Sequence, residues 1–506
     1  MEDRAEVEVR HRGLLMAAVL SAMIMQVLDA TIANVALPRM QSSLGANQDE
    51  ISWVLTSYMV CTAVMLPASG WLTSRFGARR VFITSVSLFI AASMLCGTAT
   101  SLPEIVLFRM LQGLGGALIA PLAQSTLFDI NPPSQQARAM SWFGIGVMVG
   151  PISGPMLGGW LTENFNWRWV FLINLPVGLA CLTGLWLLMP ERPRRPRQFD
   201  LPGWTLIGAA LASSQLLLDR GHQIDWFDSP EAWVEATVFV CALWMFAVHQ
   251  ATAERPLFPR EVLKNANMML ATGVMFCLGV LLFAVSGLLP GFFQHLMGFP
   301  VMISGELLAV RGTGVVLSTP LAGWLVTRVD PRLVAATGIG IMIFSLNMMS
   351  GWTLEMTGPQ QIMASVVQGF GMGFVFVPLN LLAFATLDPK LRTDGASLFN
   401  LARNMGASIG IAVVTVLLAR NTQVSHSDMV AKVTTERLGM DPGQFGQLGD
   451  AATSALMTLD AMVYREAAMI AYLDDFWLLK ACSLAALPLV LLLKPPRRAG
   501  TRSSGR

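Results

Sequence analysis

The chain has 506 residues, of which 54% are hydrophobic and only 13% are charged. Soluble domains carry roughly 25% charged residues, so this composition excludes an ordinary soluble protein and indicates a polytopic membrane protein. The formal net charge is +2, so the charge of the whole chain gives no indication of a nucleic-acid partner. All six cysteines lie in apolar runs without a CxxC motif or a Cys/His cluster, so we expect neither disulfides nor a metal site.

Apolar runs of about 20 residues recur along the chain, and each is long enough to cross a bilayer as a helix. We expect 14 spans, of which the segment 202–219 is the shortest. In chain order the expected spans are 14–38, 51–72, 81–101, 104–126, 138–161, 168–189, 202–219, 231–251, 268–292, 302–325, 333–352, 360–386, 395–419 and 473–493.

Lysine and arginine are distributed unevenly between the two sides of these spans. With a cytoplasmic N-terminus, 23 of the 34 basic residues fall on the inner side. Cytoplasmic loops carry such an excess, so we expect both termini inside, which requires an even number of spans. The one long outer loop, 420–472, is polar around Asp441, Pro442 and Gly443, and we expect some helix at 448–470.

An internal repeat divides the chain into two halves. PASGWLTSR at 67–75 is echoed by PLAGWLVTR at 320–328, and QGLGGALIAP at 112–121 by QGFGMGFVFVP at 368–378. Two parallel six-helix halves around a midplane cavity are typical of secondary transporters. We therefore predict an all-α membrane protein whose parts are a cytoplasmic N-terminus at 1–13, a first six-helix bundle at 14–189, a linker with two inserted helices at 190–267, a second bundle at 268–493 and a basic cytoplasmic tail at 494–506.

Asp29, in LDATIANVALP, is the only acid in the first apolar run. A carboxylate within hydrocarbon costs roughly 2.5–3.5 kcal/mol, so it is rarely incidental. At ~1.5 Å per residue, Asp29 lies ~13 Å and Arg109 ~9 Å from the outer ends of their helices, which is a similar depth. A nearby arginine favours the charged carboxylate and burial favours the neutral one, so we interpret this pair as a proton-coupling site. A permanent structural salt bridge is the alternative.

Two segments are candidates for conformational gating. The inner loop GWLTSRFGARR contains Gly70 and Gly77, which allow a tight turn, and three basic residues that can reach helix carbonyls or acids. These basic residues are Arg75, Arg79 and Arg80. Ordinary positive-inside arginines are the simpler interpretation.

The fifth span contains a glycine face and two internal prolines. We expect close packing against a neighbouring helix, and kinks that help to decide which way the cavity opens; a static helix crossing is the alternative. The gating candidates in this span are Gly150, Pro151, Gly154 and Pro155.

Polar residues in or near the spans are candidates for contact with substrate. Arg311 and Arg403 could bind an anionic substrate group, Glu306 or backbone carbonyls, although arginines in membranes more often anchor helices. The full set of cavity candidates is Asn34, Gln112, Glu306, Arg311, Arg403 and Asn404. No nucleophile–base pair or metal cluster is visible, so an enzyme is not expected.

LDATIANVALP, GWLTSRFGARR, Arg109 with QGLGG, GPISGPMLGGWL and NWRWVFLINLPVG together resemble the signature motifs of the 14-span drug:proton antiporters of the major facilitator superfamily, in the EmrB/QacA group. The resemblance covers about 14–495. It implies an inner-membrane exporter of hydrophobic toxic compounds that is driven by the proton gradient and needs no cofactor. EmrB-like members work with an EmrA-type periplasmic adaptor and a TolC-like outer-membrane channel.

The same resemblance assigns the first-span acid to Asp29 and the fourth-span arginine to Arg109. One departure concerns Ser74, because the wider superfamily usually has an aspartate there that forms a charge latch to the other half. Its absence puts that latch in question. In the repeat, Leu281 stands where Asp29 stands in the first half, so we expect the proton chemistry to lie in the first half.

We therefore predict alternating-access export of lipophilic compounds, often cationic or weakly acidic, in exchange for protons. A dedicated metabolite exporter or importer on the same fold is one alternative. A non-transporting membrane receptor or scaffold is a second, which would not need the internal repeat.

Overall fold

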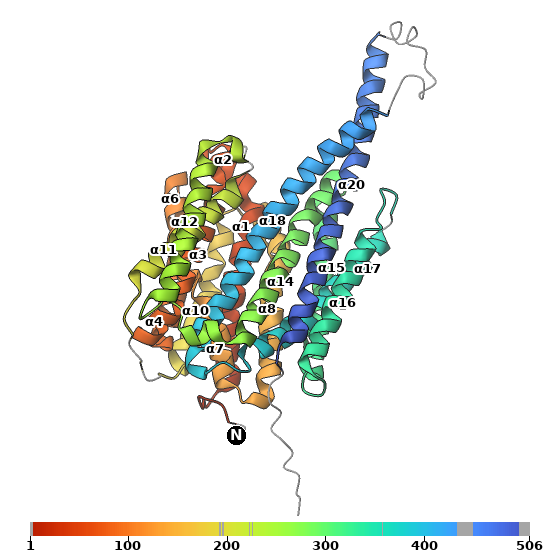
Figure 1. Cartoon of the computed structure of the whole chain (residues 1–506). Helices are drawn as coiled ribbons and strands as arrows, with labels where there is room; N and C mark the ends of the chain where they lie inside the picture. Colours follow the sequence, from red (N-terminus) through yellow and green to blue (C-terminus); the bar gives the residue numbers. More distant parts are fainter. Residues whose placement is uncertain are drawn as a thin grey trace, which may run out of the picture.

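The computed structural model describes residues 4–191, 194, 197–221, 223–224, 226–356, 358–432 and 449–494. Every regular element in this part of the chain is a helix, which confirms the all-α class. The helices form one elongated bundle, with the N-terminus at its lower end in Figure 1. The expected polar loop centre at 441–443 and the expected basic tail beyond 494 lie outside the described residues.

The first half contains six spans, two of which are interrupted. The second span breaks at Pro67, whose missing N–H favours a 3₁₀ turn, and the fourth breaks after Gly116. The elements are α1 (Arg12–Leu44), α2 (Gln48–Ile51), α3 (Trp53–Met65), η1 (Leu66–Ala68), α4 (Ser69–Phe76), α5 (Ala78–Thr98), α6 (Leu102–Gly116), α7 (Ile119–Ile130), α8 (Pro133–Asn164), α9 (Trp169–Leu172) and α10 (Asn174–Leu188).

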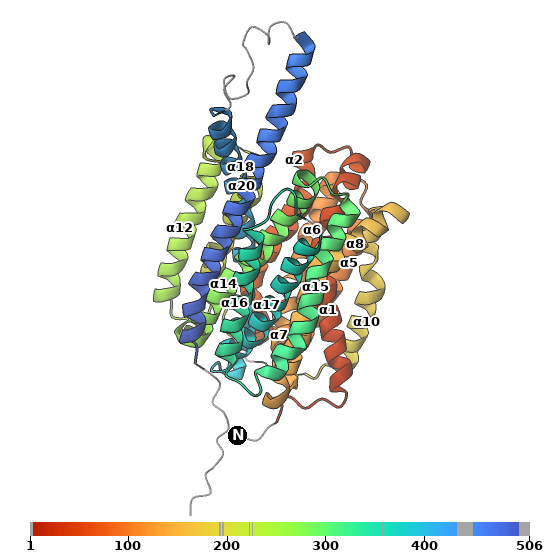
Figure 2. The same ribbon diagram turned by 90° about the vertical axis from the view of Figure 1, so that its right-hand side faces the viewer.

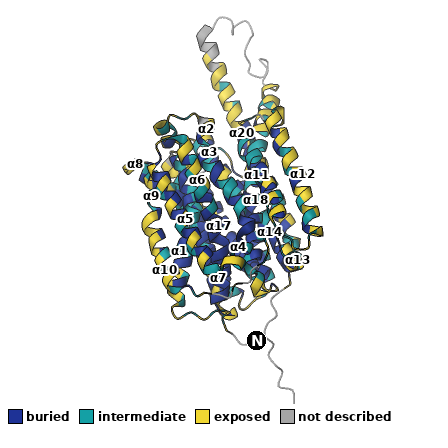
Figure 3. Ribbon diagram, turned by 90° about the vertical axis from the view of Figure 1, so that its left-hand side faces the viewer, coloured by how far each residue is buried: buried dark blue, intermediate teal, exposed yellow. Residues whose placement is uncertain are grey.

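The inserted pair is α11 (Leu201–Arg220) and α12 (Pro230–Thr252), joined by the turn η2 (Trp226–Asp228). Asp200 and Ser229 cap these helices through their side chains, so each begins where the sequence provides an N-cap. Helix α11 packs against α3 and α12. Helix α12 lies at the edge of the bundle and is largely exposed (Figure 3), as expected for a helix that faces lipid.

The second half repeats the arrangement of the first. Its elements are α13 (Arg260–Lys264), α14 (Ala266–Gly291), the π-helical turn η3 (Phe292–Leu296), α15 (Val301–Leu325), α16 (Pro331–Met349), α17 (Gly358–Phe384), η4 (Pro389–Leu391), α18 (Arg392–Val430) and α20 (Gly449–Leu492). Helix α8 of the first half packs against α15 and α17 of the second. This contact brings the two halves together at the centre.

All 14 expected spans coincide with helices. Thirteen helical segments within the described residues are long and apolar enough to cross a membrane, including the short span at α11. Helix α15 is not among them, because Glu306 and Arg311 and several small polar residues lower its hydropathy. It nevertheless lies in the bundle between α8 and α17, where protein rather than lipid surrounds much of its surface.

The structure shows more helix within the expected outer loop 420–472 than the sequence predicted. Helix α18 continues to Val430 and α20 already begins at Gly449, so much of this loop is helical, including the stretch expected at 448–470. The two helices project beyond the bundle in Figures 1 and 2. We call this part, residues 420–432 and 449–472, the outer hairpin. Polar contacts connect α18 and α20 along and below the outer hairpin. His426 Nε2 lies 2.9 Å from Asp460 Oδ1, and Asn421 donates to Asp474, just below the hairpin, at 3.4 Å.

Candidate functional site

Asp29 and Arg109 form a buried ion pair, in agreement with the similar depth expected for them. Arg109 Nη1 lies 2.7 Å from Asp29 Oδ2, and both residues are 0% exposed. Arg109 also donates from Nε to the Val54 carbonyl at 3.0 Å, and its guanidinium carbon lies 4.3 Å from the centre of the Tyr58 ring. Helices α1, α3 and α6 therefore meet at this one guanidinium group.

Two amide groups complete the surroundings of the Asp29 carboxylate. Gln112 donates to Oδ1 at 2.9 Å and Asn174 donates to the same oxygen at 2.7 Å. Asn174 also reaches Ser93 Oγ at 2.9 Å, which connects α10 to α5. One arginine and two amide donors therefore satisfy the hydrogen-bonding capacity of the Asp29 carboxylate within an otherwise apolar bundle.

The sequence did not identify Asn174 as a site residue. It lies in NWRWVFLINLPVG, a segment that contributed only to the family resemblance. The sequence feature that could have identified it is a single amide side chain at the start of an apolar span. Gln112, which was predicted as a cavity candidate, donates to Asp29 and accepts from Arg109 at 2.8 Å. Its position three residues after Arg109 puts both side chains on one face of α6.

The glycine face of α8 packs directly against α1, next to Asp29. A Cβ atom at Gly150 would lie 2.8 Å from the Val27 carbonyl oxygen, and one at Gly158 would lie 3.0 Å from that of Ile32. Thr31 donates to the Gly150 carbonyl at 2.9 Å. The predicted close-packing surface is therefore present. Pro151 and Pro155 lie inside α8, which stays helical through both of them.

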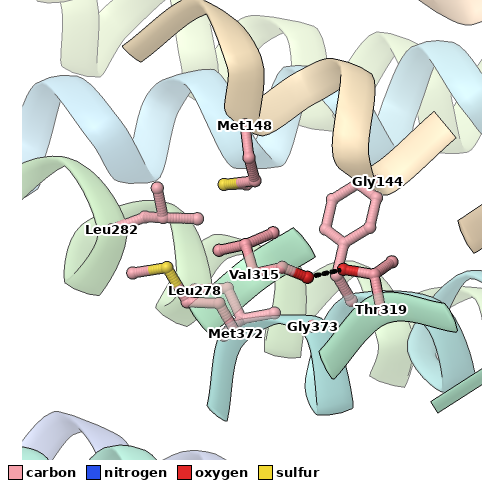
Figure 4. Close-up of a pocket in the computed structure, with 9 residues that line it drawn as sticks. Gly144, Met148, Leu278, Leu282, Val315, Thr319, Met372 and Gly373 are labelled. Carbon is pink, nitrogen blue, oxygen red and sulfur yellow. Dashed lines mark hydrogen bonds between the residues drawn. The ribbon is translucent and has the colours of Figure 1, made fainter. Parts of the chain in front are cut away.

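A small apolar cavity lies between the halves at the centre of the bundle (Figure 4). It leaves about 10 Å³ of free space, enough for about one water molecule, so the cavity is closed to any larger ligand in this state. Met148 of α8 and Leu282 of α14 face each other across it in Figure 4. Its lining comes from α8, α14, α15 and α17 and consists of Gly144, Met148, Leu278, Leu282, Val315, Thr319, Met372, Gly373 and Phe376.

The six substrate candidates differ in their exposure and lie in different parts of the bundle. Asn34 and Glu306 are exposed and Asn404 is half-buried, whereas Arg311 and Arg403 are buried in the second half. None of the six is in the cavity lining. Polar character within a span therefore did not predict the cavity wall, which is made of apolar, glycine and threonine residues.

Contacts between the halves close the end of the bundle where α1 begins and α7 ends, which we call the N-terminal face. Gln124 of α7 donates to Asn380 of α17 at 2.5 Å and accepts from Asn400 of α18 at 2.8 Å. Arg392 Nη1 of α18 lies 2.5 Å from Asp129 Oδ1 of α7. These amide and ionic contacts cross the boundary between the halves below the cavity, so the cavity is sealed on this side.

The inner loop makes its contact with the second half through Asp394, at the start of α18. A Cβ atom at Gly70 would overlap the Asp394 carboxylate, so only glycine allows this approach. Arg197 of the linker lies 2.6 Å from Asp394, and its carbonyl accepts from the Trp71 indole at 3.0 Å. A charged link from the linker to the second half is thus present beside the inner loop, although Ser74 stands where the family resemblance implies an aspartate.

The turn of the same loop is held within the first half. Arg79 donates to the Trp186 carbonyl near the end of α10 at 2.6 Å, and both Arg79 and Arg80 lie within 3.9 Å of Glu191. Reaching a helix end and an acid is what the sequence predicted for these arginines. Arg75 is exposed.

Gly77 separates α4 from α5 with φ +89° and ψ 140°, a conformation that side chains with a Cβ adopt only with strain. Gly77→Ala is expected to lower the free energy of unfolding by roughly 1–3 kcal/mol, measured by denaturant titration in detergent. Gly159→Ala is the matched control, because a Cβ there meets nothing within 4 Å and the position is helical. Equal stability of the two variants would contradict the assigned turn.

The comparisons with known proteins agree with this architecture. The Major Facilitator Superfamily model matches residues 19–411. The multidrug export protein EmrB of Escherichia coli strain K12 is 29% identical over the full length of both chains, and EmrB of Haemophilus influenzae is 30% identical over 96% of each. The fatty acid resistance protein FarB of Neisseria gonorrhoeae is 29% identical over 95% of each chain.

Solved structures with low sequence identity share the fold. The human organic anion transporter MFSD10 has a TM-score of 0.61 at 14% identity, with 95% of this chain and 99% of that one covered. The proton:xylose symporter XylE has a TM-score of 0.61 at 13% identity and 96% coverage of both. The chain therefore belongs to the major facilitator superfamily, in its EmrB-like branch, as a multi-pass membrane transporter, and is not an enzyme.

Proposed function

We propose that the protein exports lipophilic toxic compounds in exchange for protons, with Asp29 as the proton-binding group. The observation that carries this proposal is the buried Asp29–Arg109 pair, at 2.7 Å and 0% exposure of both residues. A buried carboxylate with a strong cationic partner is costly to protonate in place, because the arginine would lose its counter-charge. Proton binding is therefore linked to a conformation in which this pair opens.

The contacts of α1 provide a route from the proton site to the cavity. Asp29 stands between Val27 and Thr31, which meet Gly150 and Gly154 of α8. Helix α8 also supplies Met148 to the cavity wall. A shift of α1 on protonation would therefore move α8, which lines the cavity. Alternating access requires two arrangements of α1 against α8 whose relative stability changes when the proton binds.

The expected site of substrate binding is the central cavity after it expands. Its methionine and leucine side chains suit varied apolar ligands, because a thioether is polarizable and adapts its shape. The cavity is sealed toward the N-terminal face by the Gln124, Asn380 and Asn400 contacts. With that face in the cytoplasm, binding of substrate from inside requires these contacts to break.

Purified protein in proteoliposomes tests the exchange directly. With an outward-directed substrate gradient, we expect proton entry that a pH-sensitive dye reports inside the vesicles, together with loss of substrate. Substrate flux without proton movement would contradict the antiport mechanism. A panel of unrelated lipophilic compounds separates multidrug export from the alternative of a dedicated metabolite carrier, which predicts response to a single compound.

The outer hairpin supports a place in a tripartite pump of the inner membrane, with an EmrA-type adaptor and a TolC-like channel. It projects beyond the bundle on the side opposite the N-terminal face and presents exposed apolar groups that include Leu456, Met457 and Met462. We further propose that both termini lie in the cytoplasm, as the excess of basic residues on the inner side of the expected spans predicts. Met457→Glu is expected to reduce adaptor co-purification while leaving exchange in proteoliposomes unchanged; unaltered co-purification would argue against this surface.

A further inference from the structure

Two arginines in the second half are buried without a carboxylate partner. Arg311 of α15 is 5% exposed and Arg403 of α18 is 8% exposed, and neither forms an ion pair with any described residue. Arg311 donates from Nη2 to Ser286 at 2.6 Å, whereas its Nη1 has no partner. Arg403 has no partner at Nε or Nη1. The first half, in contrast, pairs its buried arginine with Asp29.

Arg311 lies next to the central cavity, one helical turn toward the outer side. It precedes the cavity residue Val315 by four positions in α15, which places both on one face of the helix. Its hydrogen-bond partner Ser286 follows the cavity residue Leu282 by four positions in α14. Arg311 is therefore at the outer end of the cavity, between two of the helices that form its wall.

Arg403 stands on the face of α18 that is turned toward the first half. It follows Asn400 by three positions, and Asn400 donates across the boundary to Gln124 at 2.8 Å. Its backbone is packed against Gly279 of α14, next to the cavity residue Leu278. Both arginines thus flank α14, the helix that contributes Leu278 and Leu282 to the cavity.

A guanidinium group stays charged in proteins, and an uncompensated charge inside a bundle is expensive. The N–H groups of a guanidinium form a planar fork that suits carboxylate, sulfate or phosphate oxygens. We propose that Arg311, assisted by Arg403, binds the anionic head group of an amphipathic compound whose apolar tail occupies the expanded central cavity. This inference rests on the proposed export function and narrows its substrates to lipophilic anions at this site.

Two probes with the same tail and opposite head groups test the charge selectivity: decyl sulfate and decyltrimethylammonium. Full-length protein in phosphatidylcholine nanodiscs is titrated with each probe by equilibrium dialysis. Arg311→Gln is expected to weaken decyl sulfate binding roughly ten- to hundredfold, the effect of losing hydrogen bonds to a charged group, without weakening decyltrimethylammonium binding. Arg255→Gln, the same change at an exposed linker position, should leave both affinities unchanged.

Arg311→Lys keeps the charge but loses the fork, so its affinity for decyl sulfate should lie between those of wild type and Arg311→Gln. Unchanged decyl sulfate binding in Arg311→Gln, or an equal loss of both probes in Arg311→Gln and Arg311→Lys, would overturn the proposal. Nanodiscs with added phosphatidylglycerol identify the natural source of the anion: loss of decyl sulfate binding there assigns the arginines to a lipid head group.

The proposal of proton-coupled export and the proposal of an anion site at Arg311 can be refuted independently. Absence of proton exchange with charge-selective binding intact would refute the antiport mechanism and leave the anion site standing. Exchange of cationic compounds without any charge-selective binding would refute only the anion site.

Discussion

Asp29→Asn is expected to abolish drug–proton exchange in proteoliposomes while the protein remains folded. Asparagine has nearly the same shape as aspartate and resembles its protonated form, but it cannot release a proton. The variant should therefore bind substrate and perform drug–drug counterflow, which needs no net proton movement, and should show no proton entry on addition of a drug gradient. Measurement of both fluxes in the same vesicles separates loss of coupling from loss of binding.

Asp475→Asn is the matched control for this experiment. Asp475 is 1% exposed in α20, and neither of its carboxylate oxygens has a hydrogen-bond partner. The same substitution there buries the same amide in a span of the second half, away from Arg109. It should retain wild-type exchange. If Asp29→Asn also exchanges at the wild-type rate, Asp29 is not the proton carrier.

The fold was predictable because its signals are local to each span. Hydropathy indicated the helices, and the repeat indicated two halves. The ends of the helices were harder to predict, because α18 and α20 continue beyond their apolar runs. Polar pairs such as His426–Asp460 stabilise these extensions, which have no lipid contact. Hydropathy reports the solvent around a helix and carries no information on where the helix ends in water.

For the candidate site, the sequence predicted how deep a residue lies in the membrane, but not how its helix is rotated against its neighbours. Asp29 and Arg109 were paired correctly because the helical rise fixes the depth of each residue in the membrane. Asn174 was missed because its contact with Asp29 depends on how α10 is rotated against α1. The Arg197–Asp394 link joins the linker to the second half across 197 positions of sequence, and no spacing rule indicates such a pair.

Arg109→Gln is expected to lower the free energy of unfolding strongly. Removing one partner of a buried pair leaves the other charge uncompensated, which costs about 3–5 kcal/mol. Asp29 would keep only the amides of Gln112 and Asn174, at 2.9 and 2.7 Å. Unfolding in sodium dodecyl sulfate, followed by circular dichroism, measures the loss.

The double variant Asp29→Asn/Arg109→Gln distinguishes the loss of a charge pair from the loss of packing. Without the aspartate no buried charge remains unpaired, so the double variant should be more stable than Arg109→Gln alone, although it has lost more native groups. Arg109 also contacts the Tyr58 ring and the Val54 carbonyl, and those losses persist in both variants. If the double variant is as unstable as the sum of the single changes, Arg109 acts mainly through α3, and the ion pair with Asp29 contributes little to the closed state.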